Sequence, residues 1–83
     1  MKIVWLQAFW ATVKYNSFSS AAEKMNTSQA NISKYIGALE KDLGMVLFDR
    51  SIRNAKLTDD GKAILPYVEK IIEDYSELQN VLS

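Results

Sequence analysis

Three features of the sequence predict a mostly α-helical chain that carries one small β-hairpin. Only one proline and three glycines interrupt the 83 residues, so few positions disfavour a helix. Apolar residues recur at intervals of three and four over most of the chain, which is the spacing of a helix face. Residues 45–57 are the exception, because two short β-type segments flank a polar turn there. Length and composition indicate a single folded domain.

The first predicted helix covers residues 3–15 and has two apolar sides. The main stripe consists of Ile3, Leu6, Phe9, Trp10 and Val13. Val4 and Trp5 lie off that stripe. A helix that is apolar on more than one side has to bury more than one side. Either this is a central core helix, or its second side, with Trp5, contacts a partner chain, which the short length of the chain favours.

A short second helix and a longer third helix follow. Ser20 and Glu23 have the spacing of a capping box at the start of the second helix, and Ser19 is an alternative cap one residue earlier. A turn at residues 26–28 leads into a third helix over residues 29–43, which Gly44 ends as a C-terminal cap. One face of the third helix is apolar, with Ile32, Ile36, Leu39 and Leu43. Its other face has short or cationic side chains and is open to approach.

The hairpin is predicted from residues 46–48 and 55–57, with Arg50 and Arg53 in the turn between them. Thr58 is the expected cap of a last helix that runs to the chain end. An apolar seam with heptad spacing follows that helix: Ile64, Val68, Ile71, Tyr75, Leu78 and Leu82. A helix of about 25 residues spans about 37 Å, more than the rest of the chain can cover. We therefore expect this seam, together with Trp5, to form a dimer interface.

Pro66 interrupts the last helix in the sequence. Within a helix, proline removes one hydrogen bond and costs about 3 kcal/mol. We therefore expect a kink near residues 62–66, or a helix that restarts there.

The net charge of zero hides an uneven distribution. Residues 1–56 carry eight cations and four anions, whereas residues 57–83 carry two cations and six anions. Such asymmetry between parts of a chain is itself a signal. It indicates a basic head and an acidic tail with different tasks.

The order of these elements is that of a winged helix-turn-helix at residues 1–57, followed by a linker and dimerisation helix at residues 58–83. A helix in this position enters the major groove of DNA with its N-terminal part, where Gln29, Asn31 and Ser33 lie. Gln and Asn pair with adenine by two-point contacts, and Lys34 has the reach for a phosphate or a guanine edge. On the pattern alone, an equally open interpretation is that these side chains only begin and solvate a helix. For the hairpin arginines, the alternative to DNA contact is a surface ion pair, for example with Asp49.

Seven short motifs follow one another in the sequence. They are L-x-x-F at Leu6–Phe9, S-F-S-S-A-A-E at Ser17–Glu23, S-Q-A-N-I-S-K at Ser28–Lys34, A-L-E-K-D-L-G at Ala38–Gly44, L-F-D-R at Leu47–Arg50, L-T-D-D-G at Leu57–Gly61 and L-P at Leu65–Pro66. Over about three quarters of its length, the chain thus resembles the N-terminal DNA-binding domain of LysR-type transcriptional regulators.

The resemblance implies bacterial transcription regulation through double-stranded DNA, by a homodimer that is joined through the C-terminal helix and becomes a tetramer in a full-length protein. It places Gln29, Ser33 and Lys34 at the major groove and Arg53 in the minor groove. It makes Arg50 a phosphate contact and lets the N-terminus of the second helix, at Ser19, meet the DNA backbone. An effector ligand would need the family's second domain, which this chain lacks.

Three positions depart from the family pattern. Ala30 stands where proline is usual, Gly37 where arginine is frequent, and Lys34 where arginine is common. Gly37 weakens the helix by up to about 1 kcal/mol, and Lys34 loses the two-point phosphate geometry of arginine. Ala30, Gly37 and the zero net charge support an alternative, a protein–protein interaction module with weakened DNA affinity.

Other classes of protein are excluded or disfavoured. The sequence has no His and no Cys, so the commonest general base and the commonest metal ligands are missing, and no metal or cofactor is predicted. It has neither a glycine-rich phosphate loop nor an apolar run long enough to cross a membrane. We therefore expect neither an enzyme nor a membrane protein, and we expect a cytoplasmic location.

Overall fold

The computed structural model describes residues 1–51 and 54–83. Within these ranges it contains α1 (Ile3–Tyr15), α2 (Phe18–Lys24), α3 (Gln29–Leu43), β1 (Phe48–Asp49), β2 (Lys56–Leu57) and α4 (Asp59–Leu82). The element order confirms the predicted mostly α-helical fold with a winged helix-turn-helix and a long last helix. The division of the chain into residues 1–57 and 58–83 stays a prediction.

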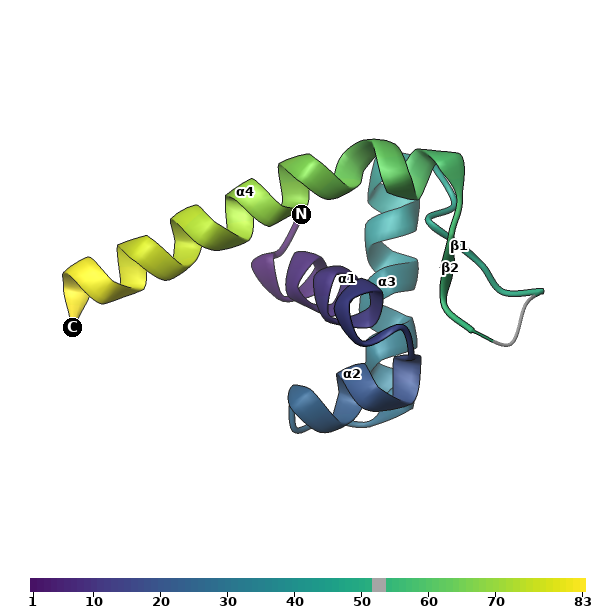
Figure 1. Cartoon of the computed structure of the whole chain (residues 1–83), viewed down its shortest axis with the longest axis horizontal. Helices are drawn as coiled ribbons and strands as arrows, with labels where there is room; N and C mark the ends of the chain where they lie inside the picture. The colour runs from purple at the N-terminus through teal and green to yellow at the C-terminus, as the bar shows by residue number, and fades with distance from the viewer. Residues whose placement is uncertain (52–53) are drawn as a thin grey trace.

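The first three helices and the hairpin form a head, and α4 extends from it (Figure 1). α4 begins beside the hairpin, packs against α1, and continues well past the head to the C-terminus. The chain is therefore elongated, with principal extents of 42 × 26 × 19 Å. The second half of α4 lies beyond the helices of the head, as its predicted length required.

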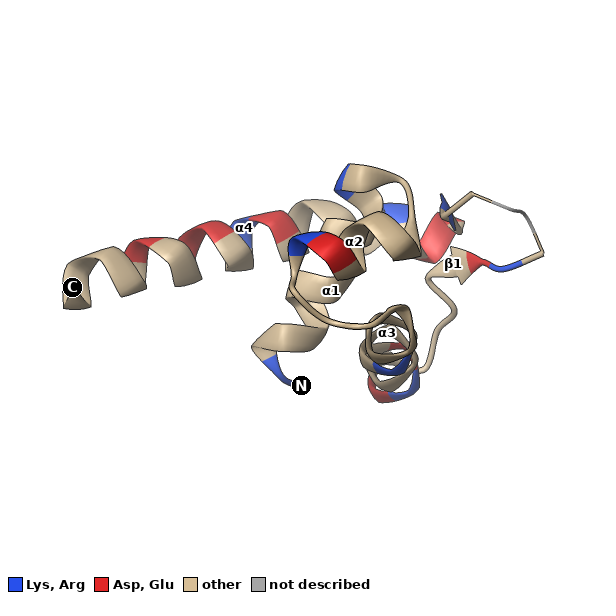
Figure 2. Ribbon diagram, turned by 90° about the horizontal axis from the view of Figure 1, so that it is seen from below, with Lys and Arg blue, Asp and Glu red and all other residues tan. Residues whose placement is uncertain are grey.

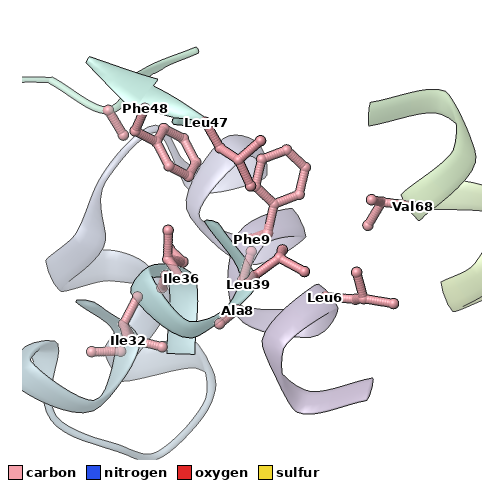
Figure 3. Close-up of a cluster of buried hydrophobic side chains, with 13 residues drawn as sticks. Leu6, Ala8, Phe9, Ile32, Ile36, Leu39, Leu47, Phe48 and Val68 are labelled. Carbon is pink, nitrogen blue, oxygen red and sulfur yellow. The ribbon is translucent and has the colours of Figure 1, made fainter. Parts of the chain in front are cut away.

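The core lies where α1, α3 and the start of the hairpin meet (Figure 3). Its fully buried large side chains include Phe9 from α1, Ile32 and Ile36 from α3, and Phe48 from β1. The Phe48 ring lies 5.4 Å from the ring centroids of both Phe9 and Phe18, in tilted and edge-on arrangements that aromatic pairs favour. The hairpin is thereby attached to the head by its first strand.

The structure corrects the predicted cap of α2. Ser17 is the N-cap, and its side chain accepts a hydrogen bond from the backbone N–H of Ser20. The predicted caps Ser19 and Ser20 lie inside the helix. The helix starts earlier because the Ser17 hydroxyl satisfies the N–H of Ser20, and the ring of Phe18 in the first turn packs against Phe48.

Each strand of the hairpin is two residues long and shorter than predicted, with Phe48 opposite Leu57 in antiparallel register. The backbone before β1 has partners outside a sheet. The Thr58 hydroxyl donates to the carbonyl of Val46 at 2.6 Å, and the Thr58 N–H donates to the carbonyl of Leu47 at 3.0 Å. Val46 and Leu47 therefore anchor the start of α4 instead of extending a strand.

α4 runs unbroken across Pro66, so the predicted restart of the helix is wrong. Figure 1 shows only a gentle change in the direction of its axis. Thr58 is its N-cap, as predicted, and accepts from the N–H of Gly61 at 3.0 Å. Asp59 and Asp60 occupy the first turn, where the helix dipole favours negative charge.

Candidate nucleic-acid interface

The buried face of α3 determines which of its side chains point outward. Ile32, Ile36 and Leu39 have no exposed surface and hold this face against α1 and α2. Helical spacing then places Ser33, Lys34 and Gly37 on the opposite side. Ser33 and Lys34 are exposed. The outward face thus combines small residues with a cation, which suits close approach to a polyanion.

Gln29 lies at the N-terminus of α3, where it meets α2. The Ser19 hydroxyl donates a hydrogen bond to Oε1 of Gln29 over 2.9 Å, and both residues are exposed. The structure therefore brings together two residues that the sequence analysis assigned to separate DNA contacts. The same bond links the N-terminal part of α2 to that of α3.

Asn31 is held in a different direction. Its Nδ2 donates to the hydroxyl of Thr27 at 2.9 Å, and its backbone N–H donates to the capping hydroxyl of Ser28 at 3.1 Å. The side chain is thus tied back to the turn between α2 and α3. Asn31 remains exposed, but this bond engages one end of its amide.

Arg50 at the hairpin is paired with Glu40 of α3. Its Nη1 lies 2.9 Å from Oε1 of Glu40, and the guanidinium lies 5.8 Å from the centroid of the Phe18 ring. The other carboxylate oxygen of Glu40 accepts from the backbone N–H of Leu47 at 2.7 Å and reaches that of Phe48 at 3.5 Å. One carboxylate therefore joins α3 to the base of the hairpin.

Asp49, the ion-pair partner considered for Arg50, has other contacts. Its carboxylate accepts from the hydroxyl and the backbone N–H of Ser51. The hydroxyl bond and then the N–H bond from Ser51 lower the pKa of Asp49, desolvation opposes them to a smaller extent, and the charge of Lys56 adds the smallest lowering effect. Arg53, the predicted minor-groove contact, lies outside the described residues.

The predicted seam of α4 divides into an inner and an outer part. Val68 is only 3% exposed within one chain, which corrects its assignment to a surface between chains. It belongs to the same buried core as Leu6 of α1, and Ile64 and Trp5 are partly buried against this core. Beyond α1, by contrast, Ile71, Leu78 and Leu82 are exposed and Tyr75 is half-buried.

An apolar groove continues from this core to the exposed part of the seam. It has a volume of about 230 Å³. Its lining comes from the N-terminus, α1, α3 and α4: Met1, Leu6, Leu43, Ile64, Tyr67, Val68 and Ile71. Tyr67 and Ile71 are 72% and 44% exposed, so apolar surface remains open on α4.

Charge follows the same division of the molecule. Figure 2 shows acidic residues spaced along α4, from its start beside β1 onward, and both basic and acidic residues on the head. Residues 1–56 carry eight cations and four anions. A polyanion that approaches the outward face of α3 meets the basic part, while most of the acidic residues lie on the extended helix.

Sequence reasoning missed two contributors to the site, Glu40 and Thr27. In the sequence, Glu40 follows Leu39 of the predicted apolar face of the third helix, and Leu39 is buried in the structure. A carboxylate next to a buried face needs hydrogen-bond partners, and this was the weak signal for Glu40. Its partners are seven to ten residues away in the sequence. Thr27 precedes the cap Ser28, and only the structure shows that its hydroxyl holds the Asn31 amide.

Comparison with known proteins identifies the family. Residues 3–62 match the profile described as bacterial regulatory helix-turn-helix protein, lysR family. The chain belongs to the LysR family. Its helix-turn-helix is therefore a DNA-binding domain of a family of transcriptional regulators, and it is not an enzyme.

Relatives with similar sequences are transcriptional regulators. The HTH-type transcriptional regulator CitR of Bacillus subtilis is 39% identical over 75 residues, which are 90% of this chain and 26% of CitR. ShiR of Corynebacterium glutamicum is 42% identical over 72 residues, or 87% of this chain and 24% of ShiR. The LysR-type chain thus spans about a quarter of the length of these two regulators.

Solved LysR-family structures have the same fold. The DNA-binding domain of BenM in complex with catB site 1 DNA superimposes with a TM-score of 0.91 at 30% identity, covering 99% of this chain and 91% of that one. The CbnR DNA-binding domain in its DNA complex superimposes with a TM-score of 0.88 at 34% identity, covering 96% of this chain and 92% of that one.

Among residues 1–51 and 54–83, none of the helices has the length and apolar character to cross a membrane, and no acidic cluster is arranged to hold a metal ion.

The outward face of α3 provides a test of helix propensity. A Cβ at Gly37 meets no atom within 4 Å, so we expect Gly37→Ala to raise the free energy of unfolding by about 0.5–1 kcal/mol. Urea denaturation followed by circular dichroism measures this gain. A loss of stability would contradict the placement of Gly37 on an open face.

Proposed function

We propose that this LysR-type domain binds double-stranded DNA in a sequence-specific manner in the bacterial cytoplasm, with the N-terminal part of α3 in the major groove. One observation carries the proposal: the core fixes α3 so that Ser33 and Lys34 point outward beside Gln29. A major groove admits one α-helix and exposes distinct patterns of donors and acceptors. The similar BenM and CbnR domains are in complexes with DNA, which supports DNA as the partner.

Each outward side chain has a distinct proposed task. Gln29 contacts a base edge. The small side chain of Ser33 allows α3 to approach the base pairs closely. Lys34 contributes a point charge to a phosphate or a guanine edge. The Asn31 bond to Thr27 makes Asn31 a secondary contact that acts through its remaining polar atoms.

The hairpin supplies the second proposed contact. Glu40 engages Nη1 of Arg50, whose side chain is still 45% exposed. A guanidinium has further N–H donors, so Arg50 can reach a phosphate while its ion pair with Glu40 stays intact. The minor-groove role of Arg53 is proposed from the family resemblance.

The DNA contacts of α3 predict two different mutant phenotypes. Gln29→Ala should relax preference at one base pair and cost about 1–3 kcal/mol at the preferred site. Lys34→Ala should weaken all duplexes similarly and reduce the salt slope by about one. Fluorescence anisotropy across a salt series measures both effects. Lys70→Ala on α4 is the matched control for loss of one cation, and an equal effect of Lys70→Ala and Lys34→Ala would contradict the proposed orientation.

We also propose a homodimer through α4, with tetramers in a full-length protein. The exposed apolar residues Ile71, Leu78 and Leu82, together with the groove beside Tyr67, leave apolar surface that a second chain can cover. Trp5 lies on α1 near this region and remains part of the proposed interface.

The dimer proposal makes its own prediction. Leu78→Asp should shift the chain from dimer to the 9.4 kDa monomer in sedimentation equilibrium, because an unpaired charge would enter the seam. Asn80→Asp adds the same charge off the seam and should leave the dimer intact. A wild-type chain that stays monomeric at high micromolar concentration contradicts the proposal.

The alternative function is a protein-interaction module with weakened DNA affinity. The zero net charge and the small Ala30 and Gly37 on the outward face favour it. Binding to random duplex at low salt separates the two proposals. A DNA-binding domain gives a steep salt slope, whereas an interaction module gives no detectable binding.

A further inference from the structure

We infer that Ser19 orients the side-chain amide of Gln29 and thereby selects the base that Gln29 reads. This inference rests on the proposed function and deepens it. It assigns Ser19 a positioning role for specificity, in place of the contact with the DNA backbone that the family resemblance implies. The observation behind it is the hydrogen bond from the Ser19 hydroxyl to Oε1 of Gln29.

The bond determines which end of the Gln29 amide is available. A serine hydroxyl has a single proton, and here it is donated over 2.9 Å to Oε1. The carbonyl end of the amide therefore faces α2, and the amino end is left to donate. With its proton used in this way, the Ser19 hydroxyl does not donate to a phosphate at the same time.

The orientation has a consequence for base readout. A glutamine that reads adenine by two-point contact uses both ends of its amide, accepting from N6 and donating to N7. Ser19 occupies one of the two lone pairs of Oε1 and holds the carbonyl end toward α2, so the amino end of Gln29 is the end left wholly free to bind DNA. Guanine offers two acceptors in the major groove, N7 and O6, whereas cytosine offers an amino donor. Gln29 held by Ser19 therefore prefers guanine and discriminates against cytosine.

The location of the pair explains how the bond survives at an exposed site. Ser19 is in the first turn of α2, and Gln29 is the first residue of α3. The capping hydroxyls of Ser17 and Ser28 fix these two helix starts. Backbone positions held in this way reduce the entropy that the Ser19–Gln29 bond must overcome.

The test uses four duplexes that differ only at the base pair contacted by Gln29, within a site selected by the wild-type chain from a random pool. Fluorescence anisotropy gives the affinity for each duplex. Ser19→Ala should reduce the preference for guanine over cytosine about tenfold. Ser19→Thr keeps the hydroxyl and should retain the preference of the wild-type chain for guanine. Unchanged urea midpoints show that both variants are folded.

A double-mutant cycle separates positioning from direct contact. In a Gln29→Ala background, Ser19→Ala should have no further effect on base preference. If Ser19→Ala weakens all four duplexes equally, Ser19 is a phosphate contact and the inference is wrong. If Gln29→Ala changes the preference but Ser19→Ala does not, the inference fails while the proposed function stands. A wild-type chain without any sequence preference overturns both.

Discussion

Gly61→Ala should destabilise the domain by at least about 2 kcal/mol, although it adds only one methyl group to a helix. Gly61 lies in the first turn of α4, against the segment that precedes β1. A Cβ at this position would lie 2.4 Å from the carbonyl oxygen of Leu47 and 2.8 Å from a methyl group of Leu57. The carbonyl oxygen belongs to the backbone and is already bonded to the N–H of Thr58, so it has little freedom to move.

Urea denaturation of the wild-type chain and the variant measures the Gly61 effect. Gly37→Ala is the matched control, since it makes the same substitution in a helix where a Cβ meets no atom within 4 Å. The two variants should change stability in opposite directions. If Gly61→Ala is as stable as wild type, α4 does not approach the carbonyl of Leu47 closely, which contradicts the described packing of α4 against the head.

Glu40→Ala should lower the free energy of unfolding by about 2 kcal/mol. The substitution removes the acceptor of the partly buried N–H of Leu47 and leaves Arg50 without its ion-pair partner. Arg50→Ala should cost less than about 1 kcal/mol, because the arginine is 45% exposed and exposed ion pairs contribute little. Glu40 is thus expected to act mainly through the backbone of the hairpin base.

Thermal and urea denaturation of both variants test this asymmetry. Glu73→Ala provides the control for loss of an exposed glutamate on a helix and should stay within about 0.5 kcal/mol of wild type. Equal losses for Glu40→Ala and Arg50→Ala would show that the ion pair, and not the backbone anchor, is the stabilising contact.

The helices of this domain were predictable because their signals are local. The apolar spacing of Ile32, Ile36 and Leu39 identified the buried face of α3, and Gly44 marked its end. The cap of α2 was misassigned among three nearby serines: Ser17, and neither Ser19 nor Ser20, is the cap. The capping-box spacing of Ser20 and Glu23 favoured the wrong one.

The hairpin and the seam were predicted less completely for the same reason. The strands are short because Val46 and Leu47 bond to Thr58, and this depends on how α4 returns to the head. Heptad spacing identified the apolar face of α4 but not what covers it. Val68 meets α1 of its own chain, whereas Leu78, three turns further on, is exposed.

The candidate site shows a similar limit. The sequence placed Gln29, Ser33 and Lys34 at the start of one helix, and the structure presents them on its accessible side. The bond between Ser19 and Gln29 joins residues on different helices. Its existence depends on the angle between α2 and α3, which follows from packing and not from the spacing of motifs.

We propose that the accessible end of α3 reads a specific DNA sequence in a dimeric LysR-type domain. Selection of bound sequences from a random duplex pool tests it most directly. The proposed function predicts enrichment of two symmetric half-sites whose centres lie about one or two helical turns apart on one face of the duplex. Recovery of a pool without any enriched sequence, from a chain that is folded and at low salt, would contradict it.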